Sequence, residues 1–327
     1  PTSCYTDEVS TNQSGSGILA TTPHYELYSE LDLDETQTIA RLLEASWQAF
    51  EDYFHEAPLL GSGELLQVKL YIDFDAWQAG MISNGVSNPP SSAGGYFDPA
   101  TRTAYLYQQP TLYYTRVLAL HEVAHQFHLL GRGKGASPPS WYVEGIAEYI
   151  SRHDWDGSCV KLGVLPLLSQ EDPLASALET VKANGLNLTS VVNDQGYQRP
   201  IAMAVTRYFE TADGGAHADD YQAFEDAVDI NGANATTAFN DLLGMPSSYD
   251  APIEAWLQNE QEPMSVMFRE WTHISSTSAR GRASGVLTIA RLKKPTQQFA
   301  ARYTGPGEGG FLIAYDNSMK YVAVVLR

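Results

Sequence analysis

The chain has 327 residues, which exceeds the usual size of a single domain and suggests about two. Hydrophobic residues make up 43% of it and charged residues 18%, and no apolar run reaches the roughly 18 residues that a membrane-spanning helix needs. Its formal net charge of -19 repels the phosphates of nucleic acids and the surfaces of anionic membranes. We therefore expect a soluble, globular chain with no nucleic-acid partner and no membrane partner.

The N-terminal third predicts a tail, one helix and two strands. Residues 1–23 are rich in Ser, Thr and Gly and show no hydrophobic period, so we expect an N-terminal tail there. From 34 to 56, apolar residues recur every three or four positions and predict an amphipathic helix. Alternating patterns at 66–72 and 103–107 predict half-buried strands, and the Pro- and Gly-rich stretch 84–95 between them predicts a loop.

The middle of the chain predicts helices. After Cys159 the pattern is helical, with no strand signal. The predicted helices are 111–130, 141–151, 173–183, 197–210, 219–230 and 251–260.

After Pro263 the pattern changes to short alternating segments, which predict strands, among them 286–292, 299–303 and 310–315. This change predicts a domain boundary near residue 263. The expected fold is therefore α+β: a main domain over 24–262, with a small sheet followed by helices, and a small all-β domain over 263–327.

The most informative segment is His121-Glu122-Val123-Ala124-His125, inside a predicted helix. Residues four apart lie on one helix face, so both imidazoles can reach one metal ion while Glu122 projects toward a bound water molecule. The alternative is two histidines that ordinary hydrogen bonds satisfy on a core helix.

A catalytic zinc ion usually has three protein ligands and a fourth position for water, and His128 and Glu144 are the nearest candidates for the third ligand. His128 lies seven residues after His121. That spacing is about 10 Å along a helix axis, too far for both to join His125 around one tetrahedral ion. Glu144 lies on the next predicted helix, after a Gly/Pro-rich turn. We predict that Glu144 is the third ligand and that His128 either supports the ligands without touching the metal or packs in the core.

His121-Glu122-x-x-His125, followed by 18 residues and then Glu144, resembles the gluzincin zinc metallopeptidases. The Trp-x-x-Glu-Gly-x-Ala-Glu-Tyr segment that begins at Trp141 is more specific than the first motif. The likeness is closest to the compact peptidase MA-like members, and the spacing is similar to that of the aminopeptidases in this group. The competing metzincin pattern would place Gly at position 128 and His at position 131, and this sequence has neither.

The resemblance covers about residues 24–262 and implies a gluzincin-type catalytic domain. His121, His125 and Glu144 would bind one Zn2+ per chain, and Glu122 would be the general base. Glu148, one helical turn after Glu144, would orient the first histidine without touching the metal. The alternative for Glu148 is an acid on a solvated helix surface.

Tyr197 begins a segment similar to the family's Tyr-x-Lys-Gly helix start, although Arg199 and Pro200 replace Lys and Gly here. In the family, this phenol hydrogen-bonds the developing oxyanion. The resemblance therefore implies the same role for Tyr197, with a packing tyrosine or a donor such as Tyr208 as the alternatives.

The implied reaction is hydrolysis of a peptide bond in a peptide or protein substrate. Zinc lowers the pKa of its bound water to about 7, and Glu122 would activate this zinc-bound water and pass the proton to the leaving amine. By analogy, Gly94, Gly95 and Tyr96 would border the substrate cleft on an edge strand, the alternative being a plain Gly turn.

Endopeptidase activity is the expected specificity. Aminopeptidases with this zinc spacing clamp the substrate amine with an acidic residue from a Gly-x-Met-Glu-Asn segment, which is absent here. Asp98 is the nearest acid, and because Pro99 follows it, Asp98 is expected to brace a turn. An aminopeptidase or a hydrolase of a non-peptide bond are the alternative enzymes. Outside enzymes, the alternative is an extracellular binding protein on an inactive peptidase scaffold.

Two further expectations concern the cysteines and the C-terminal domain. Cys4 and Cys159 are the only cysteines, an even count that is compatible with one disulfide in a secreted or otherwise extracytoplasmic protein. The alternative is two buried thiols. The stretch 264–327 faintly resembles half of a concanavalin-like sandwich that a longer native chain would complete, so it is expected to bind carbohydrate or protein, or to act as a structural cap.

Overall fold

The computed structural model describes two compact units of the chain. The first comprises Pro1–Val164 and Pro173–Leu257, and the second comprises Leu165–Asp172 and Gln258–Arg327. The residues described are 2–133, 138–165, 173–196, 198–259, 265–266, 271–275, 278–281, 288–289, 309–317 and 320–326.

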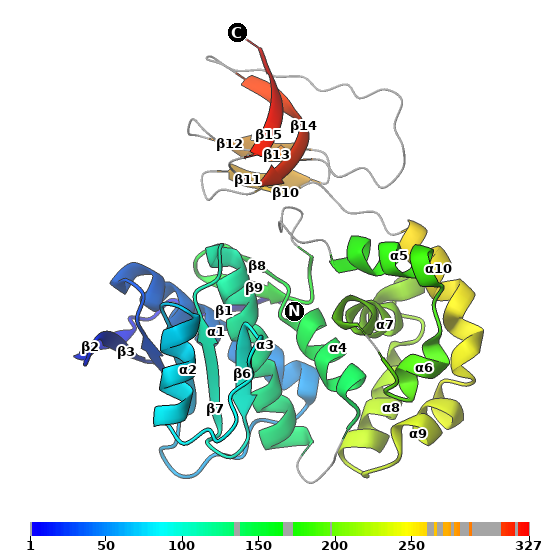
Figure 1. Cartoon of the computed structure of the whole chain (residues 1–327), viewed down its shortest axis with the longest axis horizontal. Helices are drawn as coiled ribbons and strands as arrows, with labels where there is room; N and C mark the ends of the chain where they lie inside the picture. Colours follow the sequence, from blue (N-terminus) through cyan, green and yellow to red (C-terminus); the bar gives the residue numbers. More distant parts are fainter. Residues whose placement is uncertain are drawn as a thin grey trace. The chain divides into compact units, whose positions relative to one another are not determined.

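A mixed six-stranded sheet forms one half of the first unit (Figure 1). Its central pairs β4–β5 and β5–β7 are parallel, whereas β2–β3, β3–β4 and β7–β6 are antiparallel. Strand β6 therefore ends the sheet as an edge strand, beside the helix that carries the two motif histidines. In spatial order the strands are β2 (Ser10–Ser14), β3 (Gly17–Thr21), β4 (Tyr25–Ser29), β5 (Leu66–Tyr71), β7 (Thr103–Tyr107) and β6 (Gly95–Asp98).

Helices cover both faces of this sheet. On one face, α1 (Leu33–Phe54) packs against α3 (Leu112–Phe127) through stacked and edge contacts of Trp47 and Phe50 with Phe127. On the other face, α2 (Phe74–Ser83) buries Trp77 among aromatic side chains of the strands. Helix α2 is not predicted from the sequence, because only Trp77 and Met81 of its ten residues are buried and no continuous apolar stripe results.

The expected N-terminal tail over 1–23 is three strands in the structure, two of which extend the main sheet. The polar strand β2 lies at the sheet edge, so its sequence lacks the alternation that reveals a half-buried strand. Strand β1 (Thr2–Cys4) instead joins β9 (Cys159–Leu162) and β8 (His153–Trp155) in a separate antiparallel sheet. The expectation of no strand from Cys159 onward is therefore corrected by β9, whose pairing partner lies far away in sequence.

Helices form the other half of the first unit (Figure 1). They pack around buried aromatic rings of α4, α7, α8 and α9. The helices predicted for this half are present with ends within two residues, and the short helices α6 and α9 were not predicted. The helices are α4 (Ser140–Ile150), α5 (Pro173–Asn184), α6 (Leu188–Val192), α7 (Arg199–Thr211), α8 (Ala218–Asp229), α9 (Ala235–Leu242) and α10 (Asp250–Asn259), with 3-10 turns at Ala212–Gly214 and Pro246–Tyr249.

The described part of the second unit consists of antiparallel strand pairs, β10 with β13, β11 with β12, and β14 with β15. The predicted strand 299–303 lies outside the described residues. The whole chain therefore mixes helices and sheets, in agreement with an α+β class, and among the described helices none has the length and apolar character needed to cross a membrane. The strand bounds are Ser265–Val266, Trp271–Ser275, Ser278–Gly281, Thr288–Ile289, Gly309–Asn317 and Lys320–Leu326.

Candidate metal centre

Helix α3 holds the two motif histidines in a rigid, buried position. Thr111 caps its N-terminus by accepting a hydrogen bond from the backbone of Tyr114. Its apolar residues from Val117 to Phe127 are almost completely buried against the sheet and α1, which fixes the rotation of the helix. His121 and His125 lie one turn apart, and their Nε2 atoms are 3.1 Å from each other.

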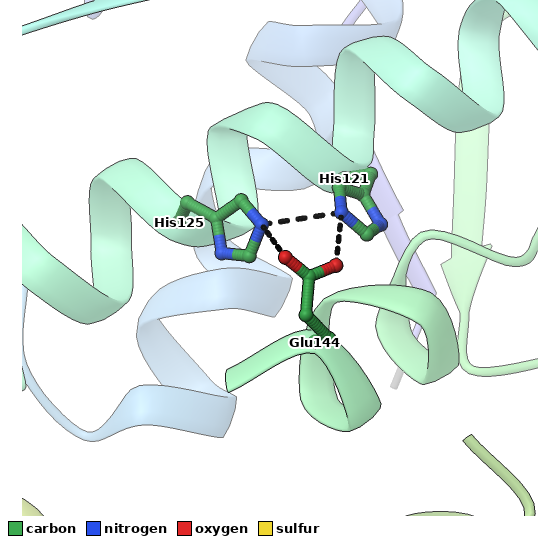
Figure 2. Close-up of side chains that lie close together, drawn as sticks. All are labelled: His121, His125 and Glu144. Carbon is green, nitrogen blue, oxygen red and sulfur yellow. Dashed lines mark hydrogen bonds and ion pairs between the residues drawn. The ribbon is translucent and has the colours of Figure 1, made fainter. Parts of the chain in front are cut away.

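Glu144 of α4 approaches the same point from the facing helix. Its Oε2 lies 3.3 Å from His121 Nε2 and its Oε1 lies 3.7 Å from His125 Nε2. Figure 2 shows the two rings and the carboxylate pointing toward one another from two helices. One ligand atom from each residue lies within 4.8 Å of the others, so these three residues could hold a metal ion.

The polar atoms at this point fit a bound cation. Glu144 Oε2 is buried and makes no hydrogen bond of good geometry with any described residue, although His121 Nε2 and Arg199 Nη2 lie 3.3 and 3.2 Å away. A buried carboxylate oxygen needs a positive charge beside it, which Arg199 supplies in part and a bound cation would complete. Two imidazole nitrogens converging with this carboxylate form a common donor set for a divalent transition metal.

The electrostatic environment favours the metal-binding protonation states of His125 and Glu144. For His121, burial lowers the pKa, but the contact with Glu144 and the charges of the surrounding carboxylates outweigh burial and raise it. Burial, followed by the charge of His121, lowers the pKa of His125 to about 3. Burial raises the pKa of Glu144, but its close contact with His121 outweighs this and holds the pKa well below its ordinary range. His125 is therefore neutral and Glu144 ionised near neutral pH, as metal ligands must be.

Glu122 lies between α3 and the edge strand β6. Burial raises its pKa to about 7, although the charge of His121 lowers it, and the backbone N–H of Phe97 donates to its carboxylate. A Cβ at Gly95 would lie only 2.5 Å from Glu122 Oε1. The glycine predicted at the cleft border therefore lets the strand approach Glu122, which can exchange a proton near neutral pH.

The other two predicted cleft residues occupy different positions. A Cβ at Gly94 would lie 2.7 Å from Leu118 Cδ1, so this glycine permits close packing of the loop on α3. Tyr96 pairs with Tyr105 in the sheet, and its ring packs on the buried cluster around Trp77. Because neighbouring strand residues face opposite sides, the Tyr96 ring lies on the other face of the sheet from Gly95 and Glu122.

Glu148 lies beside the first histidine, with its Oε1 3.6 Å from His121 Nδ1. This distance is that of an ion pair and too long for a hydrogen bond. Arg152 Nη2 donates to Glu148 Oε2 at 2.6 Å, and Arg199 lies near both carboxylates, at 3.2 Å from Glu144 and 3.6 Å from Glu148. The sequence pattern identified Arg199 only as a departure from the family motif, and its contact with Glu144 requires the folding of α7 against α4.

The remaining candidate residues from the sequence lie away from the three converging side chains or outside the described residues. Tyr197 lies outside the described residues, and its alternative, Tyr208, packs in the aromatic core of the helices against Phe209 and Trp256. Asp98 is buried and accepts a hydrogen bond from the backbone of Thr101 at 2.9 Å, which is the expected bracing of a turn. His128 does not join the three residues that could hold a metal ion, and its Nε2 is hydrogen-bonded to Asp229 at 2.9 Å.

No protein-family model matches this sequence, and a comparison with curated proteins gives no significant match.

Proposed function

We propose that this chain is a zinc-dependent endopeptidase of the gluzincin type. The observation that carries the proposal is the convergence of His121, His125 and Glu144 from two helices, with the buried carboxylate of Glu122 beside them. Two histidines and one glutamate form a three-ligand zinc site that leaves a position for water, the arrangement of catalytic rather than structural zinc.

The distances are compatible with a zinc ion. A tetrahedral zinc ion with bonds of about 2.0–2.1 Å separates its ligand atoms by about 3.3 Å. The corresponding distances here are 3.1 Å between the imidazoles and 3.3 and 3.7 Å from them to the Glu144 oxygens. When bound, zinc would polarise the scissile carbonyl as a Lewis acid and make water a stronger nucleophile near neutral pH.

In this proposal Glu122 moves the proton. Its carboxylate accepts a proton from the attacking water and delivers it to the leaving amine, a role for which a pKa near the working pH is best. The proposed partner of Glu122 in transition-state stabilisation is Tyr197, as donor to the developing oxyanion. Glu148 and Arg199 support the site by contacting His121 and Glu144.

Strand β6 is the proposed platform for the substrate backbone. It is an edge strand, so one of its sides can pair with an extended peptide, and Gly95 keeps this strand close to Glu122. Asp98, the acidic residue nearest in sequence to Gly95, braces a turn with its carboxylate. It therefore offers no clamp for a substrate amine, which supports cleavage within a chain over removal of the first residue.

The Cys4–Cys159 disulfide is compatible with an extracytoplasmic protein, and we propose secretion or export on this ground.

The test is cleavage of one peptide prepared with a free and with an acetylated amino terminus, with products identified by mass spectrometry. The proposal predicts internal cleavage of both forms, loss of activity with a zinc chelator and recovery on adding zinc. Glu122→Gln should retain zinc and lose at least about 100-fold in rate. Products formed only by removal of a free first residue would show an aminopeptidase, and unchanged turnover by Glu122→Gln would remove this residue from the mechanism.

A further inference from the structure

A cluster of buried polar side chains around Asp229 lies at the far end of the metal-binding helices. The Asp229 side chain, at the end of α8, has an exposed fraction of 0%. His128 Nε2 donates to its Oδ1 at 2.9 Å, while Arg132 Nε and Tyr142 Oη donate to its Oδ2 at 3.1 and 2.7 Å. One carboxylate thus receives hydrogen bonds from three different side chains.

These three donors come from the segments that carry the metal-binding residues. His128 and Arg132 belong to the π-helical turn His128–Arg132 that directly continues α3 beyond His125. Tyr142 belongs to α4 and lies two residues before Glu144. Asp229 therefore connects the end of the helix that carries both histidines to the helix that carries the glutamate.

The hydrogen bonds of this cluster constrain the relative positions of the helices that contribute to it. A fully buried carboxylate is costly unless it is paired and fully hydrogen-bonded, and here Arg132 also donates to the backbone carbonyl of Phe54 and to Asp226. Removing one partner of such a network leaves buried charge uncompensated, so the network resists relative sliding of its helices. A metal site tolerates displacements of only about 0.2 Å in its ligand distances.

We infer that Asp229 is a positioning residue of the metal centre: through His128 and Tyr142 it sets the separation of α3 and α4 at which His121, His125 and Glu144 converge. The inference rests on the proposed function, because it assumes that these three residues bind zinc. Asp229 does not contact the metal-binding atoms in this role and acts only through the two helices.

Tyr142→Phe is the mildest test, because it removes the hydroxyl that reaches Asp229 and keeps the ring, which packs edge-on against His128 and Phe224. Tyr53→Phe is the matched control. Tyr53 Oη donates to buried Glu225 at 3.1 Å, but this bond joins α1 to α8 and does not connect the metal-binding helices. Asp229→Asn perturbs the same hydrogen-bond network more strongly, because it removes the charge of the shared acceptor.

The measurement is the zinc dissociation constant of each purified full chain by competition with a chromophoric chelator, together with the melting temperature of the metal-free form. We expect zinc binding about tenfold weaker for Tyr142→Phe, weaker still for Asp229→Asn, and changed less than about twofold for Tyr53→Phe. Melting temperatures should fall in both Tyr→Phe variants, since each loses a buried hydrogen bond to an acidic side chain of α8.

Unchanged zinc affinity in Tyr142→Phe, or equal weakening in Tyr142→Phe and Tyr53→Phe, would overturn the positioning role and leave the cluster as a source of stability only. A wild-type chain that binds no zinc would instead contradict the proposed function itself.

Discussion

Gly95 determines how closely the edge strand approaches the proposed general base. Its Cα faces the Glu122 side chain, where an added Cβ would meet Oε1 at 2.5 Å and Cγ at 2.9 Å. Because Cγ is also too close, Glu122 would have to change its rotamer rather than bend its tip. The position therefore couples backbone geometry to the orientation of the carboxylate.

We predict that Gly95→Ala lowers kcat at least tenfold and leaves zinc content unchanged, since a misoriented base loses its contribution while the metal ligands stay in place. The measurement is steady-state peptide cleavage alongside metal analysis. Gly61→Ala is the control, because its nearest neighbour is the flexible Glu64 side chain at 3.2 Å, and its rate should match the wild type. Full activity of Gly95→Ala would show that Glu122 needs no such close approach.

At the level of single residues, the sequence predicted the pairing of His121 and His125 because local rules determine it. A spacing of four on one helix face places His121 beside His125 in any helical conformation. The choice of Glu144 rested on its place on the next predicted helix, and the resemblance to a known motif pointed to the same residue. Contacts that depend on tertiary folding were not predictable, such as the bond between His128 and Asp229, which lie 101 residues apart.

At the scale of the elements, helix α8 buries Glu225 in the core, and the free-energy cost of this burial depends on pH. The Glu225 side chain is 2% exposed, and burial, followed by the charge of Glu210, raises its pKa well above the ordinary value of 4.5. Because the folded-state pKa is raised, the contribution of Glu225 to the free energy of unfolding is fully present below pH 4.5. It is lost as pH rises through the folded-state pKa.

We predict that Glu225→Gln removes this dependence. Above pH 4.5, the free energy of unfolding of the metal-free wild type should fall with pH more steeply than that of the variant. The difference in slope should approach about 1.4 kcal/mol per pH unit, the value for one proton. Urea unfolding followed by circular dichroism at several pH values measures both slopes, and parallel slopes would show that Glu225 ionises normally in the fold.

The elements that the sequence predicted are those with a clear local apolar pattern, either a helical stripe or the alternation of a half-buried strand. Helix α1 shows this pattern over 22 residues and is recovered nearly to its ends. Strands β1 and β9 are paired but lie far apart in sequence. Strand β2 is polar because it lies at the edge of its sheet. Neither long-range pairing nor edge position leaves a local signal, so these strands read as irregular.

At the scale of the molecule, one covalent bond joins the N-terminus to the region after α4. Cys4 and Cys159 are opposite each other in the β1–β9 pair and form a disulfide across a sequence separation of 155. In the chain-entropy model, a crosslink that closes so long a loop stabilises the folded state by about 4–5 kcal/mol.

We predict that the double variant Cys4→Ser, Cys159→Ser unfolds at a lower denaturant concentration, with a loss of about 2–5 kcal/mol. Chemical denaturation of both proteins measures the difference. As a check on the bond itself, the unreduced, denatured wild type should show no titratable thiol. Two thiols per chain in that assay would refute the disulfide.

The most direct test of the zinc site is metal stoichiometry after chelation and refilling. We predict about one zinc per wild-type chain and per Glu122→Gln chain, because Glu122 is not a ligand, and strongly weakened binding by Glu144→Ala, which leaves only the two imidazoles. No zinc uptake by the refilled wild type, or undiminished binding by Glu144→Ala, would contradict a zinc centre formed by His121, His125 and Glu144.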